Sequence, residues 1–444
     1  MATVNLKDAR KANSSAVSRE QKFKDRYNMY QGNYRYQAKA RLEDIYDKAA
    51  LIGMDKQLDM TNNVFRSIID KTSKVYTNGV VREINDQTVA DYYDDLRIDQ
   101  FMTQANKYLN ALNDLVVQVV WDEANNRPKM IFRYPHKTRV ELDEFGDPKS
   151  VEYFVENLEK GKTKWAYWSE TEHYYREYAT DGSYEKDSLN DDDVNPFGFL
   201  PFIFMQKGFR DGTFFDEHSG TDLVETTLDN SIYNTFKNYL IKWQSFKQIV
   251  VVGQNVGEID GQMLDPSSAI TVSGTDVNFQ LLDLQANLDE LAGVLDASIS
   301  KIAINYNISP AQFKMTSQVS TGFALKMENQ SLDNITRENQ KDFVLYEREL
   351  NALITKIGNM YGNNFQDGFI IAFNPIAYQE RDEEKLNAYT RSVDLGLTNP
   401  IEIISKDKNI PLDKAKGIWE ENIKIRNDML NKLGSIEIKT DIED

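Results

Sequence analysis

The chain has 444 residues, a formal net charge of −18 and no cysteine. The lack of cysteine excludes disulfides and thiolate metal sites. The acidic balance argues against tight nucleic-acid binding, which depends on phosphate neutralisation by Lys and Arg. A hydrophobic content of 41% with 11% aromatic residues predicts an ordered protein with a large core and about two to four substructures.

Neither a secretion signal nor a membrane span is predicted. The first residues, "MATVNLKDARKANSSAVSREQKFK", contain no apolar core of a signal peptide. The longest apolar runs, such as "GFLPFIFM", are too short to cross a bilayer. We therefore expect a protein that is cytosolic or is assembled in a cytosol.

The first part of the chain reads as helices and the next part as strands. Apolar residues at helical spacing predict helices over Glu20–Gln31, Asn62–Asn78 and Asp91–Asn113. Alternating and β-branched runs between turn residues predict strands over Leu115–Trp121, Lys129–Tyr134, Arg139–Leu142, Val151–Glu156, Lys164–Trp168 and Glu172–Ala179. We expect Asp187–Pro196 to be a polar loop.

The second half is mainly helical, with a small insert. Thr221–Phe246 lacks Gly and Pro and predicts a helix of roughly 39 Å. A β-rich insert should follow over Lys247–Gln285, and then a return helix over Asn287–Asn305. We expect a polar segment over Met315–Gly322 and a long helix over Thr321–Tyr361. A strand, "DGFIIAFNP", and two or three helices between Asp382 and Leu433 complete an α+β chain.

Acidic residues are missing from two stretches beside the insert. Asn230–Gly257 carries Lys237, Lys242 and Lys247 without an acid, and Ala297–Met327 carries Lys301, Lys314 and Lys326 without one. For either stretch alone, a buried region that lacks acids by chance explains the pattern. Two such stretches flanking one insert are less easily explained by chance.

Candidate catalytic and metal motifs fail on inspection. "KGKT" ends like a phosphate-binding loop, but Glu156 stands where the first glycine is needed, and strands rather than a helix flank it. "DDDVN" starts like a calcium loop, but Pro196 and Phe202 occupy the glycine and glutamate positions. The three histidines, His136, His173 and His218, are widely separated. We expect no catalytic residues, no metal and no cofactor.

Several stretches, taken in order, resemble the portal proteins of tailed bacteriophages, in the branch common in long-tailed phages. The resemblance covers nearly the whole chain, and the order of the stretches carries it more than any one of them. They are "RYNMYQGNY", "NNVFRSIIDKTSKVYTNG", "NPFGFLPFIFM", "STGFALK" and "DEEKLNAYTRSVDLGLTNPIEIISKDKNIPLDKAK".

The resemblance implies a portal-type α+β fold with a helical stem, a long wing helix, a β-rich wing and clip, and a small helical crown. The implied regions are the wing at 1–220, stem helix at 221–246, clip at 247–285, second stem helix at 286–305, tunnel loop at 306–322, long wing helix and strand at 323–375, and crown at 376–444.

The resemblance also implies a non-enzymatic ring, usually dodecameric, at one capsid vertex, through which double-stranded DNA passes during packaging and ejection. Within it we expect weak contact with DNA, without sequence specificity, from the tunnel-loop residues Lys314, Thr316, Ser317, Gln318, Ser320 and Thr321. Gly322 would be the hinge into the helix, and Lys237, Lys242 and Lys247 would face the stem channel.

The implied partners are further copies of the chain, the large terminase, major capsid and scaffolding proteins, and head-tail connector proteins, with no membrane. The implied location is the virion, after assembly in the host cytoplasm. Two alternatives stay open on the residues alone: another virion assembly protein, and an α+β polymer-modifying enzyme.

Overall fold

The computed structural model describes residues 6–45, 57–187, 193–208, 212–244, 248–254, 275–282, 288–313, 322–376, 382–408 and 410–437. They form two compact units, one of Met1–Thr316 with Asn329–Ile376 and one of Ser317–Glu328 with Ala377–Asp444. The fold mixes helices and mainly antiparallel strands, as the α+β prediction requires. Every helix within the described ranges is too short or too polar to span a membrane.

The larger unit begins with helices that pack around the central strands. They are α1 (Leu6–Gln31), α2 (Arg35–Ile45), α3 (Val64–Thr72), α4 (Gln87–Asp95) and α5 (Ile98–Leu112). The helix expected over Asp91–Asn113 is in fact two helices, because Arg97 adopts a left-handed backbone with φ 52°. The helix expected to reach Asn78 ends at Thr72, and turns follow it.

Two sheets form the β-rich part of this unit. A three-stranded sheet has the order β3 (Arg127–Arg133), β2 (Asp114–Asp122) and β9 (Phe202–Gln206). A five-stranded sheet runs in sequence order through β4 (Thr138–Leu142), β5 (Pro148–Asn157), β6 (Thr163–Ser169), β7 (His173–Tyr178) and β8 (Tyr184–Asp187). All pairings are antiparallel.

Strand β2 lies at the centre of the core, covered on both faces. Leu115, Val117 and Val119 are completely buried, which accounts for the nearly continuous apolar run "LVVQVVW". The one polar residue within it, Gln118, is also buried, and its Oε1 accepts hydrogen bonds from Nε and Nη2 of Arg133 at 3.0 and 2.7 Å. The buried amide oxygen is therefore satisfied by the neighbouring strand.

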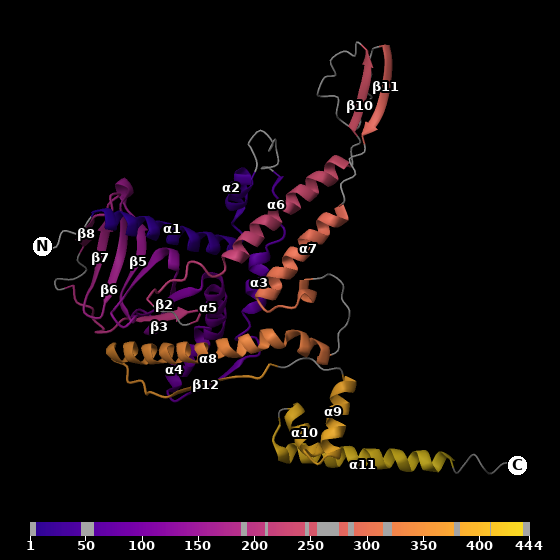
Figure 1. Cartoon of the computed structure of the whole chain (residues 1–444). Helices are drawn as coiled ribbons and strands as arrows, with labels where there is room; N and C mark the ends of the chain where they lie inside the picture. Colours follow the sequence, from indigo (N-terminus) through magenta and orange to yellow (C-terminus); the bar gives the residue numbers. More distant parts are fainter. Residues whose placement is uncertain are drawn as a thin grey trace. The chain divides into compact units, whose positions relative to one another are not determined.

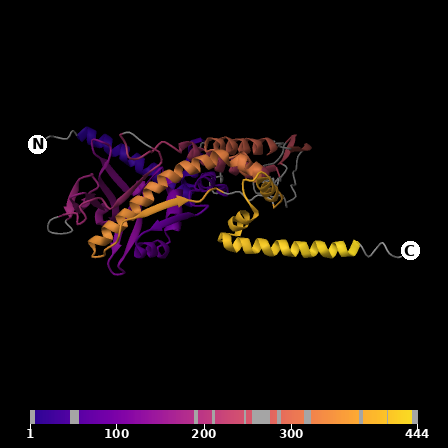
Figure 2. The same cartoon turned by 90° about the horizontal axis from the view of Figure 1, so that it is seen from below.

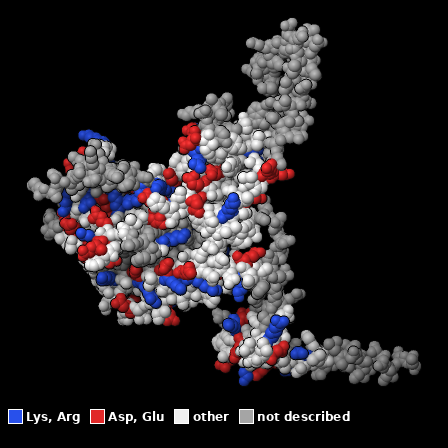
Figure 3. Space-filling model, in the orientation of Figure 1, with Lys and Arg blue, Asp and Glu red and all other residues white. Residues whose placement is uncertain are grey.

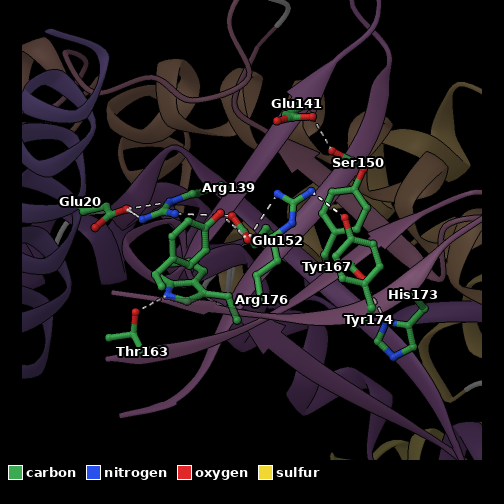
Figure 4. A network of polar contacts seen from close by, with 12 residues as sticks. Glu20, Arg139, Glu141, Ser150, Glu152, Thr163, Tyr167, His173, Tyr174 and Arg176 are labelled. Atoms are coloured by element: carbon green, nitrogen blue, oxygen red, sulfur yellow. Dashed lines mark hydrogen bonds and ion pairs between the residues drawn. The ribbon is translucent and has the colours of Figure 1, made fainter. Parts of the chain in front are cut away.

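The outer face of the five-stranded sheet carries a polar and aromatic network (Figure 4). Buried Glu152 accepts a hydrogen bond from the Tyr178 hydroxyl at 2.9 Å and lies 3.5 and 3.6 Å from Arg139 and Arg176. Burial raises the pKa of the Glu152 carboxyl, and Tyr178 and the two arginines oppose that shift. Arg139 also reaches Glu20 of α1 at 3.1 Å, which ties the helix to the sheet.

The long helix α8 (Gly322–Met360) is anchored by a buried carboxylate. Glu347, with no exposed surface, accepts hydrogen bonds from Arg82 at 2.6 and 2.9 Å and from the Tyr76 hydroxyl at 2.8 Å. Arg82 belongs to β1 (Val80–Ile84), which pairs with β12 (Phe369–Phe373), the strand that follows α8. Figures 1 and 2 show β12 running alongside α8.

The remaining elements of the larger unit are α6 (Thr221–Gln244), the strands β10 (Gln248–Gln254) and β11 (Thr275–Leu282), and α7 (Leu288–Asn305). Figure 1 shows α6 beside α7, with the β10–β11 pair joined to their ends. The strands of this pair are antiparallel.

The smaller unit contains α9 (Asp382–Asp394), α10 (Pro400–Lys408) and α11 (Leu412–Glu437). Their boundaries follow local signals in the sequence. Gly396, with φ 66°, lies just beyond the end of α9, where Leu397 N donates to Ser392 O at 2.9 Å. Asn399 then caps α10 by accepting a hydrogen bond from Glu402 N at 2.9 Å. The two predicted breaks, "GLTNP" and "NIPLD", therefore separate three helices.

Removal of the Glu347 carboxylate should destabilise the larger unit strongly. The variant Glu347→Ala leaves the Arg82 charge without its buried partner, so we expect the free energy of unfolding to fall by about 3–5 kcal/mol. Asp99→Ala is the matched control, because Asp99 contacts the same arginine at 2.6 Å from a carboxylate that is 63% exposed. For the control we expect about 1 kcal/mol or less. Denaturant unfolding measures both, and equal costs would contradict this account.

Candidate functional site

The candidate site is the helix–hairpin–helix unit formed by α6, the β10–β11 pair and α7. Of the residues proposed from sequence, Lys247 and the whole loop set lie outside the described residues: Lys314, Thr316, Ser317, Gln318, Ser320 and Thr321. Lys242 lies in α6, with its side chain outside the described part. Gly322 is the first residue of α8, where the hinge was expected.

The contact between α6 and α7 is partly polar. Buried Leu228 and Ile232 of α6, with Leu295 and Ile302 of α7, supply apolar surface. Asn230, with no exposed surface, donates from Nδ2 to Thr226 O at 2.9 Å within its own helix and to Ser298 Oγ of α7 at 3.4 Å. Such hydrogen bonds fix the rotation and register of the two helices more closely than apolar contact alone.

A row of buried hydroxyl and amide residues lies along α6. Several of them bond to carbonyl groups of α6 itself, and Ser231 and Thr235 also bond to the body of the larger unit. The row is Thr227, Asn230, Ser231, Asn234 and Thr235. Thr235 Oγ1 accepts a hydrogen bond from Asp59 N at 2.9 Å, and Asn238 donates to the Asp59 carboxylate at 2.6 Å. Helix α6 is therefore positioned by directed hydrogen bonds.

The outward face of α7 is small, apolar and basic. Val294, Ala297, Lys301 and Ile304 recur at three- and four-residue spacing, and all four are exposed. No acid occurs between Ala297 and the end of the helix, whereas its first half contains Asp289, Glu290 and Asp296. This surface can approach a polyanion without repulsion and holds too few cations to bind one tightly.

Lys237 of α6 is half-buried, and its Nζ donates to Asn234 Oδ1 of the same helix at 3.2 Å. This lysine is therefore held along α6 and does not extend freely from it. On the face of the molecule in Figure 3, acidic and basic side chains are interspersed among the coloured residues, and they form no continuous basic patch.

A cavity of about 240 Å³ lies where α6 and α7 meet the body, lined in part by Phe65, Lys207, Asp216 and Tyr306. The polar groups around it form hydrogen bonds with neighbouring residues of the chain. The Tyr306 hydroxyl donates to Asp222 Oδ1 at 3.1 Å, and burial together with Asp222 raises the Tyr306 pKa. Asn113 Nδ2 donates to Asp216 O and Ser219 O at 3.2 and 2.7 Å. The cavity thus fixes the start of α6 and offers no nucleophile paired with a base.

The motifs dismissed from sequence occupy structural positions. Lys160 and Gly161, both with positive φ, make the turn of the β5–β6 hairpin, and Lys162 pairs with Glu185 at 3.2 Å. This arrangement confirms the interpretation of "KGKT" as a hairpin turn. Within "DDDVN", Asp191 and Asp192 lie outside the described residues, and Asp193 pairs with Lys186 at 2.7 Å.

The histidines are separate, and two of them are packed against rings. His173 stacks on Trp168 at 3.4 Å between centroids, His136 lies 5.2 Å from the Tyr27 ring, and His218 is exposed. Burial lowers the pKa of His136 to about 4, with smaller contributions from Lys137 and Lys24. Across the described ranges, His, Asp and Glu form no group of three or more that could hold a metal ion.

Comparison with known proteins finds similarity among solved structures only. No protein-family model and no curated protein matches the chain. A chain from the virion of a native gene transfer agent (GTA) particle is 10% identical with a TM-score of 0.44, and the match covers 81% of this chain and 93% of that one. Chains from the neck of empty and native GTA particles, computed with C6 and C12 symmetry, are 10% and 9% identical with TM-scores of 0.45. Each of these two matches covers 82% of this chain and 94% of the other.

Deletion of the insert should weaken self-association. A two-stranded pair such as β10–β11 is marginally stable alone, and its edges favour pairing with another chain. Joining α6 to α7 without Gln248 to Leu284 should therefore lower the assembly size measured by sedimentation. Unfolding of the body should change little, which serves as the control. An unchanged assembly size would show that the insert makes no contact between copies.

Proposed function

We propose that the chain is a portal protein of a tailed bacteriophage, which forms a ring at one capsid vertex and conducts double-stranded DNA during packaging and ejection. The observation that carries the proposal is the order of elements. A long helix, a small β insert, a return helix and an acid-free segment lead into the 39-residue helix α8. The sequence resemblance to portal proteins follows the same order.

The physical properties of the site support a passive conduit. The second half of α7 and the segment up to Met327 carry no negative charge, so DNA phosphates meet no like charge there. Small hydroxyl and amide side chains such as Ser317, Gln318 and Thr321 offer weak, sequence-independent contacts. Three lysines in that stretch are too few to arrest a moving duplex, since tight binding requires many phosphate contacts.

In this proposal the chain provides no energy for packaging. The work comes from a terminase ATPase that docks at the β10–β11 end, and connector proteins take its place after packaging. Capsid and scaffolding proteins surround the ring in the virion. The alternative of a polymer-modifying enzyme would need a catalytic group of residues. Across the described ranges, His, Asp and Glu form no group of three or more that could hold a metal ion.

Assembly size tests the proposal directly. Twelve copies of the 51.2-kDa chain give a ring of roughly 600 kDa. Negative-stain images of the purified protein should show rings with a central channel, and mass measurement should give a closed oligomer. A protein that is monomeric at all concentrations would contradict the portal assignment and favour the enzyme alternative.

A negative charge placed in the loop should impede DNA. Ser317→Asp or Thr321→Asp would place one carboxylate per subunit at the proposed constriction, and repulsion acts over a Debye length of about 8 Å at physiological salt. We expect intact rings, shorter packaged DNA and partial recovery as salt rises. Ser317→Asn is the uncharged control. Full-length packaging by the Asp variants at low salt would place the loop away from DNA.

A further inference from the structure

The structure contains an aromatic residue that is exposed on an ordered turn. Phe145, at the tip of the β4–β5 hairpin, is 83% exposed. The turn is held by the Asp143 carboxylate, which accepts hydrogen bonds from Phe145 N and Asp147 N at 2.8 and 2.9 Å. A side chain this exposed on an ordered turn is available for contact with another chain.

The same turn is strongly acidic. Asp143, Glu144 and Asp147 flank Phe145, and all three are exposed. A surface that receives this turn must therefore offer an aromatic or apolar cavity with positive charge at its rim. We call Asp143–Asp147 the acidic aromatic turn.

A cavity with these properties lies between α1 and the five-stranded sheet. It has a volume of about 480 Å³, within the range of ligand-binding pockets. Its walls include four rings, those of Tyr27, His136, Phe154 and Trp165. Phe154 and Trp165 meet edge to face at 5.8 Å, so an incoming ring would meet aromatic walls.

The rim of the cavity is positive. Lys24 and Lys137 are exposed there, and among the described residues neither has a carboxylate within ion-pair distance, while the Lys137 ammonium lies 5.2 Å from the centre of the Phe154 ring. The one acid in the lining, Glu20, already pairs with Arg139 at 3.1 Å, as Figure 4 shows. The two lysines are therefore available to the carboxylates of an incoming segment, in a chain whose net charge is −18.

His136 is one of the rings that line the cavity. Its Nδ1 is buried and has no hydrogen-bond partner in the described part of the chain. Its low pKa keeps the ring neutral near pH 7, so the lysines supply the positive charge.

We propose that the cavity between α1 and the five-stranded sheet receives the acidic aromatic turn of a second copy of this chain, with Phe145 among the rings and its flanking carboxylates near Lys24 and Lys137. The inference rests on the proposed ring and specifies one contact that builds it. Phe145 cannot fill the cavity of its own chain. The cavity borders the start of β4 at Lys137, and Phe145 lies beyond the other end of this extended strand, roughly 16 Å along it.

The turn and the cavity are different surfaces, and the proposed ring uses them head to tail. Each copy would give its turn to one neighbour and receive the turn of the other. Repetition of such a contact closes a ring when the rotation between copies divides a full circle. The contact thus supplies a means of cyclic assembly that does not depend on the β10–β11 pair.

Photo-crosslinking tests the contact without disrupting it. The full-length chain would carry p-benzoylphenylalanine in place of Phe145, in a mixture of isotopically light and heavy copies. We expect crosslinks between copies that map to the peptide containing Glu20–Asn28 or to the peptides containing His136, Phe154 or Trp165. Crosslinks confined to other regions, or absent between copies, would overturn the proposal.

Substitutions measure the energy of the contact. Phe145→Ala should weaken self-association about tenfold or more, since a buried aromatic anchor commonly carries at least that share of affinity. Phe145→Tyr is the matched control and should assemble normally. The melting temperature should not change in either variant, because the side chain is exposed within one chain. Equal association of the Ala and Tyr variants would count against the contact.

Charge exchange distinguishes a direct contact from a general loss of solubility or folding. Lys137→Glu should weaken association in a salt-dependent way, and Glu144→Lys in the same chain should restore part of it. An absence of rings in the wild-type protein would contradict the proposed function itself. Wild-type rings that persist unchanged in Phe145→Ala would contradict only the contact proposed here.

Discussion

The larger unit depends on one buried ion pair that joins distant parts of the chain. Glu347 of α8 binds Arg82 of β1 and the Tyr76 hydroxyl, although 265 and 271 residues separate them in sequence. Because β1 also pairs with β12, the helix is held by the carboxylate at its middle and by the strand that follows it. A buried charge tolerates little displacement from its partner, so this pair fixes α8 along its axis and in rotation.

Helices α6 and α7 are held in a different way. Their mutual contact and the contact of α6 with the body use hydroxyl and amide groups such as Asn230, Ser231 and Thr235 at buried positions. Apolar contacts would allow the helices to slide with little cost, whereas directed hydrogen bonds are lost on a small shift. The outward face of α7 needs no such bonds and is free of acids over its second half. Rigid placement and a weakly interacting surface are thus combined in one pair of helices.

The two faces of the five-stranded sheet make different contacts. Its inner face supplies Val151, Ala166 and Trp168 to the core, while its outer face sets Glu152 between Arg139 and Arg176. Arg139 holds Glu20, and this contact keeps α1 over one edge of the sheet. The cavity that we propose as an interaction site exists because the helix is held at that distance.

The sequence by itself determined the local structure wherever one short-range signal dominates. Helices α6, α7 and α8 were predicted to within a few residues, because apolar residues recur at helical spacing within them, and α6 also lacks Gly and Pro. The hairpin at Gly161 followed from its turn residues, and the prediction of two or three helices after Asp382 is met by three. The polar segment Met315–Gly322 was predicted from its composition, and Gly322 is the first residue of helix α8.

Tertiary structure decided what depends on distant residues. Strand β1 is short and pairs with a strand almost 290 residues away, so no local pattern revealed it. The break at Arg97 requires a left-handed backbone that its side chain does not favour, and the packing of α4 and α5 imposes it. The cavity beside α1 unites residues from Glu20 to Trp165. The helical pattern over Glu20–Gln31 did not reveal this cavity, because periodicity reports which face of an element is apolar, and not whether another element fills the space beside it.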